Sequence, residues 1–267
     1  MSMAGLPGSL TDFGPAALAA IVVAGYLVIG EPMVGHVLHR RFEGRLRTEP
    51  GARASFYRRL LVLEWGLALL ALVVWLSAPG VDAGQVGLRW PQQWPGPVTG
   101  RGVLLVLGFV VVSTRALRSG ALLDAEPVRR PSHSPPGRGR HAEPEAHATL
   151  SLLPRTAGER RLFTLVGVTA GVCEEWLYRG FFLAVVASLA GGLPTGVLVL
   201  VAAAAFGLAH AYQGWVGIIT TGLLGGVMAA VYLQTGSLLL PVLLHAVIDL
   251  RFLLVPARAL PAGQAVA

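Results

Sequence analysis

Residues 162–190 read LFTLVGVTAGVCEEWLYRGFFLAVVASLA, a 29-residue apolar run that is long enough to cross a membrane as a helix. Three charged residues interrupt it within six positions: Glu174, Glu175 and Arg179. A charge at mid-depth in the bilayer costs roughly 3 kcal/mol on an insertion scale, so charges there are retained mainly where they have a use. The stretch therefore predicts a transmembrane helix that carries a functional site.

The composition of the whole chain agrees with a membrane location. Of its 267 residues, 54% are hydrophobic and only 13% are charged, whereas an ordinary soluble domain has about 25% charged residues. Apolar runs of membrane-spanning length recur along the chain, and the backbone inside a bilayer must satisfy its own hydrogen bonds. We therefore expect an all-α, polytopic integral membrane bundle of about seven transmembrane helices, over residues 15–38, 60–76, 102–117, 162–190, 195–210, 215–233 and 238–255.

The net charge of +7 comes mainly from arginines in two loops, residues 39–59 and 118–161. Positive loops stay in the cytoplasm, so this distribution places the N-terminus outside and the C-terminus inside. Trp90 and Trp94 suit the outer interface of the intervening loop. The basic surface then indicates contact with the lipid bilayer and not with nucleic acid. The first span lacks a basic front end and a cleavage site, so we expect it to be retained.

The polar residues divide the chain into regions. Residues 1–118 hold three spans whose membrane-depth residues appear bland, and residues 119–155 are rich in proline and arginine, which predicts a disordered cytoplasmic linker. His133, His141 and His147 are spaced irregularly in that linker, which favours solvated side chains over metal ligands. A four-span catalytic core is expected over residues 156–256, with a C-terminal tail at 257–267.

The core contains three pairs of residues spaced four apart. Glu175 and Arg179 share a helix face, where they can form an ion pair and leave Glu174 free. Such charges can also simply hold helices together in a bundle. The lone cysteine beside Glu174, Cys173, is predicted to be a packing residue, because an apolar setting makes a thiol inert.

Two histidines complete the set. Phe206 is followed by His210, and His245 by Asp249, whose carboxylate can orient the His245 ring. If successive helices are antiparallel, Glu174, His210 and His245 converge on one cavity. A carboxylate and two imidazoles around a water form a hydrolytic set, with the acid as base and the imidazoles polarising water or oxyanion. The same three residues are also a possible zinc ligand set, so no cofactor is certain and zinc stays open.

These motifs, Glu174-Glu175-x-x-x-Arg179, Phe206-x-x-x-His210 and His245-x-x-x-Asp249, resemble those of the CAAX prenyl endopeptidase and bacteriocin-processing (CPBP) family of intramembrane proteases, also called the Abi family. The resemblance covers about residues 162–255. It implies a helical membrane core around a cavity open to the cytosol. It also implies that Glu174 activates water with support from Glu175 and Arg179, while His210 and His245 bind the water and oxyanion. Asp249 stands where many members have asparagine.

The sequence thus predicts a metallo- or glutamate-dependent intramembrane endopeptidase, acting on a peptide or membrane-protein substrate. The alanine, glycine and arginine bias, with no lysine in the sequence, is typical of a bacterial source, so we expect the bacterial cell membrane, with the active site facing the cytoplasm. Two alternatives stay open. Buried Glu, Asp, His and Arg also build proton or ion pathways, and the same bundle could serve as a non-catalytic scaffold, such as a bacteriocin-immunity-type factor.

Overall fold

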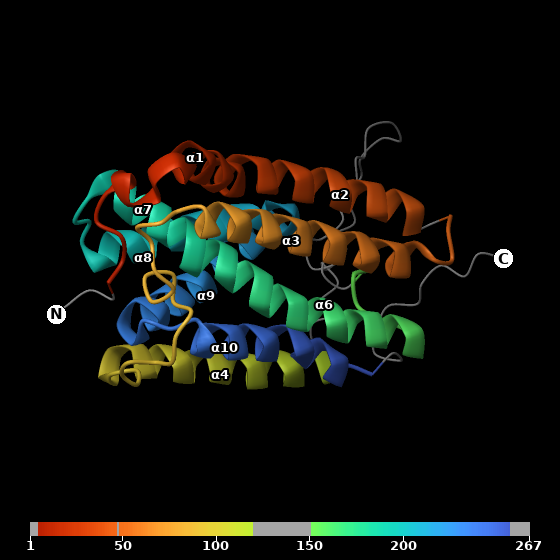
Figure 1. The fold of residues 1–267 in the computed structure, drawn as a ribbon. Coiled ribbons are helices and arrows are strands. Elements are labelled where there is room, and N and C mark those ends of the chain that lie inside the picture. Colours follow the sequence, from red (N-terminus) through yellow and green to blue (C-terminus); the bar gives the residue numbers. More distant parts are fainter. Residues whose placement is uncertain (1–4, 47, 120–150, 257–267) are drawn as a thin grey trace, which may run out of the picture.

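A computed structural model describes residues 5–46, 48–119 and 151–256 of the protein. Within these ranges the chain is helical and contains no strand, and the long helices run roughly along one common axis (Figure 1). The predicted all-α fold class is confirmed. The elements are η1 (Leu10–Ala16), α1 (Ala17–Gly25), η2 (Tyr26–Gly30), α2 (Glu31–Leu46), α3 (Ala52–Leu76), α4 (Pro97–Arg118), α6 (Ala157–Glu175), η3 (Trp176–Phe182), α7 (Leu183–Ala190), α8 (Thr195–Ala209), η4 (Ala211–Gln213), α9 (Gly214–Thr235), α10 (Leu239–Leu250) and η5 (Arg251–Leu254).

Four helical segments are long and apolar enough to cross a membrane: 10–46, 52–76, 97–118 and 211–235. The continuous helix 157–190 is also long, but it carries three charges at its centre. The remaining two, α8 and α10, have 15 and 12 residues, so they rise only about 22 and 18 Å. Large apolar side chains such as Leu104, Leu105 and Val112 point outward from the bundle, as expected for a surface that faces lipid.

The helix formed by α6, η3 and α7 supplies much of the buried core. Every residue of η3 is buried. Trp176 donates to the carbonyl of Ala68 on α3, over 3.1 Å. On the other side, Gly171 lets α10 approach, because a Cβ at this position would lie 3.2 Å from both the carbonyl oxygen of Val242 and the backbone nitrogen of Ala246. These contacts fix the charged centre of this helix between α3 and α10.

Two stretches of the bundle are π-helices, η2 and η3, in which the helix is widened by one residue per turn. Acidic residues flank both: Glu31 follows η2 directly, and Glu175 precedes η3. The Tyr178 hydroxyl on η3 donates to the carbonyl of Leu27 on η2, over 3.3 Å. The two widened turns are therefore tied to each other, and they bring Glu31 and Glu175 into the same part of the molecule.

Two ends of the core helices, the start of α6 and the end of α9, have well-defined caps. Thr156 begins α6 with a capping box, in which its hydroxyl accepts from the Glu159 amide while the Glu159 carboxylate accepts from the Thr156 amide. Gly236 ends α9 in the left-handed conformation, with φ of 67°. The loop before α4 packs on this turn, since Arg89 donates to the Gly236 carbonyl over 2.9 Å.

The predicted linker, 119–155, falls mostly outside the described residues, as does the tail at 257–267. Its last residues, 151–155, are described and pack against the bundle. Leu153 is 1% exposed, and the Tyr57 hydroxyl on α3 donates to the carbonyl of Leu152. This segment leads the chain directly into α6.

Candidate active site

The centre of the site is an ion pair within one helix. Arg179 donates from Nη1 to Glu175 Oε1 over 2.9 Å, and both side chains are fully buried. The second guanidinium nitrogen, Nη2, donates to the carbonyl of Gly225 on α9 over 3.0 Å, and the guanidinium carbon lies 4.3 Å from the centre of the Phe206 ring. The pair predicted from the four-residue spacing is therefore present, and it links α6 and η3 to α8 and α9.

The same carboxylate oxygen also holds His245. Glu175 Oε1 lies 2.7 Å from His245 Nδ1. Because a carboxylate paired with arginine can only accept, Nδ1 carries the proton and Nε2 is directed elsewhere. Nε2 lies 3.9 Å from Glu174 Oε2 and 3.8 Å from Asp249 Oδ2. The sequence suggested that Asp249 orients this ring, but the structure shows that Glu175 holds Nδ1, while Asp249 lies beyond hydrogen-bonding distance from Nε2.

His210 is fixed by its own backbone. Its Nδ1 lies 2.9 Å from the carbonyl oxygen of Phe206, one turn earlier. A carbonyl oxygen can only accept, so Nδ1 is protonated and Nε2 is left as the second functional atom of the ring. The Phe206 ring lies between the two histidines, with its centroid 4.7 Å from that of His210 and 5.8 Å from that of His245. Phe206 thus keeps the two imidazoles apart.

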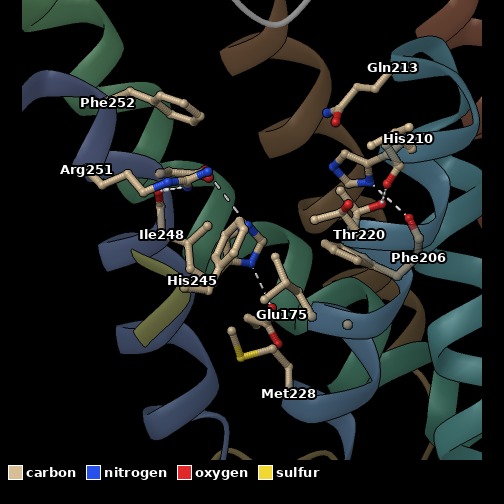
Figure 2. Close-up of a pocket in the computed structure, with 17 residues that line it drawn as sticks. Glu175, Phe206, His210, Gln213, Thr220, Met228, His245, Ile248, Arg251 and Phe252 are labelled. Atoms are coloured by element: carbon tan, nitrogen blue, oxygen red, sulfur yellow. Dashed lines mark hydrogen bonds and ion pairs between the residues drawn. The ribbon is translucent and has the colours of Figure 1, made fainter. Parts of the chain in front are cut away.

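Two cavities meet at these histidines. The first has a volume of about 400 Å³, and Figure 2 shows His245 and His210 on opposite walls of it, with Glu175 at its base. The second has a volume of about 230 Å³ and is lined by Glu174, His210, His245 and Asp249, among others. The predicted convergence of Glu174, His210 and His245 on one cavity is therefore confirmed in the second cavity. Glu174 lines only the second cavity and Glu175 only the first.

The second cavity also contains two acids that the sequence analysis missed. Glu31 at the start of α2 and Glu64 in the middle of α3 both line it. The prediction that the first three spans are bland at membrane depth is therefore wrong. The sequence does mark both residues, because each is a single acid within an apolar run. An acid in such a run indicates a functional residue, as it does for Glu174. Cys173, as predicted, is buried in the core, with 1% of its surface exposed.

The proposed zinc ligands do not form a ligand set as they are placed. Within the parts of the chain that the structure describes, no group of three or more His, Cys, Asp or Glu side chains is arranged to hold a metal ion. His245 directs Nδ1 to Glu175, so only its Nε2 could serve as a metal ligand in this placement.

Comparison with known proteins agrees with this geometry. Residues 157–251 match a family model described as type II CAAX prenyl endopeptidase Rce1-like. This segment is an Rce1-like domain. The resemblance seen in the three motifs is thereby confirmed, and the match implies CAAX-type protease activity in general. Together with the apolar helices, it identifies a membrane protein. No curated protein and no solved structure matches the chain. The Rce1-like domain begins at α6 and ends just after α10, so it includes all six residues of the predicted site.

Proposed function

We propose that the protein is an intramembrane endopeptidase that hydrolyses a peptide bond of a peptide or membrane-protein substrate with a water activated by Glu174. The observation that carries this proposal is the separation of Glu174 Oε2 and His245 Nε2. At 3.9 Å it is too long for a direct hydrogen bond. A water placed off the line between the two atoms can contact both, and Glu174 Oε2 is buried with no other hydrogen-bond partner in the described chain.

The reaction follows from these placements. The water oxygen attacks the carbonyl carbon of the scissile bond, and Glu174 takes one of its protons. His245, whose Nδ1 is held by Glu175, and His210, whose Nδ1 is held by Phe206, direct their Nε2 atoms to the water, from which the neutral rings accept a hydrogen bond. A ring that is also protonated at Nε2 donates from that atom to the developing oxyanion. Glu174 then returns the proton to the leaving nitrogen as the carbon–nitrogen bond breaks. The products are a carboxylic acid, which keeps the second proton of the water, and an amine; transfer of that proton between them gives the carboxylate and the ammonium ion.

Supporting residues keep the reacting groups in place. Arg179 neutralises Glu175, so that of the two adjacent glutamates Glu174 is the one left free to exchange a proton. Asp249, 3.8 Å from His245 Nε2, stabilises positive charge on that ring. We propose further that the cavities open toward the cytoplasm of a bacterial cell membrane. This is supported by the basic loops at the ends of α2, α3 and α4.

The test uses the full chain in lipid nanodiscs and a library of membrane-anchored peptides, with products read by mass spectrometry. Glu174→Gln keeps the shape of the side chain but cannot take a proton, so cleavage should fall by about 10²–10⁴-fold. Glu49→Gln, which alters an acid outside both cavities, should cleave at the wild-type rate. Cleavage that survives Glu174→Gln would contradict the proposal. Complete loss of wild-type cleavage with a chelator would replace it with a metal-dependent mechanism.

A further inference from the structure

The second cavity joins the N-terminal helices to the Rce1-like domain. Its walls come from α2 and α3 on one side and from α6 and α10 on the other. Glu31 and Glu64 therefore reach the same space as Glu174, although they lie far from it in the sequence and outside the matched domain. Any substrate group that enters this cavity meets side chains of both regions.

Carboxyl groups are the most numerous titratable groups of this cavity, beside the imidazoles of His39, His210 and His245. Four carboxyl groups line it, those of Glu31, Glu64, Glu174 and Asp249, and Glu64 is within electrostatic range of the other three. No arginine or lysine of the described chain lines it. The Oε2 atoms of both Glu64 and Glu174 are buried and lack a hydrogen-bond partner in the described ranges. Buried carboxylate oxygens in this state leave hydrogen-bonding capacity that a bound donor can satisfy.

The rest of the wall is apolar. Aliphatic residues of α3, α6 and η3 line the cavity beside the acids: Leu60, Leu63 and Leu67 on α3, Val166 on α6 and Leu177 on η3. The volume of about 230 Å³ far exceeds the roughly 10–15 Å³ that one water needs by the same measure. An apolar wall with acids is complementary to a side chain that has an aliphatic stem and a cationic tip, which describes lysine and arginine.

We propose that this cavity is a substrate subsite for a lysine or arginine side chain next to the scissile bond, with Glu31 and Glu64 as the residues that select it. The proposal rests on the hydrolytic function above. Glu174 keeps its role toward water, and the two N-terminal acids supply the charge that recognises the substrate. The N-terminal helices then decide which peptides the Rce1-like domain cleaves.

The experiment compares pairs of membrane-anchored peptides that carry either lysine or its uncharged isostere norleucine at each position around the cleaved bond. For the wild-type protein in nanodiscs, we expect kcat/KM to be at least about tenfold higher for the lysine peptide at one position. The double variant Glu31→Gln/Glu64→Gln should reduce this preference to less than about threefold. The kcat/KM of the lysine peptide should fall, while the kcat/KM of the norleucine peptide should stay unchanged. Glu49→Gln is the matched control, because hydrogen bonds from Arg45 lower the pKa of the Glu49 carboxyl and keep it charged; it should retain the preference.

Equal cleavage of both peptides at every position, or a preference that is unchanged in the double variant, would overturn the proposal. If the double variant does not fold, the single variant Glu64→Gln is used with the same criteria. Binding of the same peptide pairs, measured by fluorescence anisotropy, separates this proposal from the hydrolytic one. If neither peptide is cleaved but the lysine peptide binds at least about tenfold more tightly and loses this advantage in the double variant, the subsite stands and the hydrolytic function fails. Equal binding in that case overturns the subsite.

Discussion

Substitution of Arg179 by methionine tests whether the buried ion pair organises the site. Methionine is unbranched and apolar, so it fills much of the same space without the charge. The change removes the 2.9 Å bond to Glu175, the 3.0 Å bond to the Gly225 carbonyl and the contact with the Phe206 ring. It also leaves the fully buried Glu175 carboxylate without its arginine.

The size of the effect follows from these contacts. Two hydrogen bonds to a charged group contribute about 1.5–3 kcal/mol each, and breaking a buried pair by removing one partner costs about 3–5 kcal/mol in total. We expect the free energy of unfolding of Arg179→Met to fall by about 3–5 kcal/mol, measured by denaturation in mixed detergent micelles. The double variant Glu175→Gln/Arg179→Met should recover part of this loss, because it leaves no unpaired charge.

The control is Arg45→Met, which breaks the exposed pair with Glu49 and should leave the unfolding curve unchanged within error. A loss below about 1 kcal/mol in Arg179→Met would refute the reasoning, because it would show that the buried charge needs no partner. The free energy of unfolding is also measured for Glu175→Gln alone. If the loss in the double variant equals the sum of the losses in Glu175→Gln and Arg179→Met, the coupling between the two residues is refuted.

Three further predictions concern the site and the packing around it. His210→Ala should lower cleavage by about 10²–10³-fold in the peptide assay, because its Nε2 serves the water or oxyanion. The unfolding curve should not change, since within the described chain the side chain hydrogen-bonds only to the Phe206 carbonyl one turn earlier. Gly207→Ala places a Cβ 2.6 Å from the carbonyl oxygen of Ile218 and should push α8 away from α9, which lowers the free energy of unfolding by about 1–3 kcal/mol. The control is Gly108→Ala, whose new Cβ has no atom within 4 Å and should cause no loss. Thr156→Ala removes the capping box of α6 and should cost about 1 kcal/mol, seen as faster hydrogen exchange in the first turn of that helix.

Much of the fold could be predicted from the sequence, because the bilayer imposes strong rules on length and composition. The seven apolar runs correspond to the seven helical segments of the described chain, and the Glu175–Arg179 pair follows from its four-residue spacing. The π-helical turn over Trp176–Phe182 could not be predicted, since it depends on how the buried side chains of neighbouring helices fit together. Its bond from Tyr178 to Leu27 joins residues 151 positions apart, and no local pattern encodes that distance.

The site was predicted in part. The spacing on each helix indicated Glu174, His210 and His245, and their convergence required only that the helices alternate in direction. The sequence could not predict which acid holds the His245 ring, because this depends on how the helices are rotated about their axes. Glu175 holds the ring in the structure, whereas the sequence suggested Asp249. Glu31 and Glu64 belong to none of the motifs of residues spaced four apart, so only their position as single acids within apolar runs marks them in the sequence.

The composite wall of the second cavity has a consequence for how proteins of this kind can diverge. All the groups that we propose to take part in the reaction lie on one stretch of chain, while Glu31 and Glu64 come from another. If Glu31 and Glu64 select the substrate as proposed, mutation or exchange of the N-terminal helices would change which peptides are cleaved and leave the proposed reacting groups in place. Conversely, a fragment containing only residues 157–251 would keep the reacting groups but expose one side of their chamber to acyl chains.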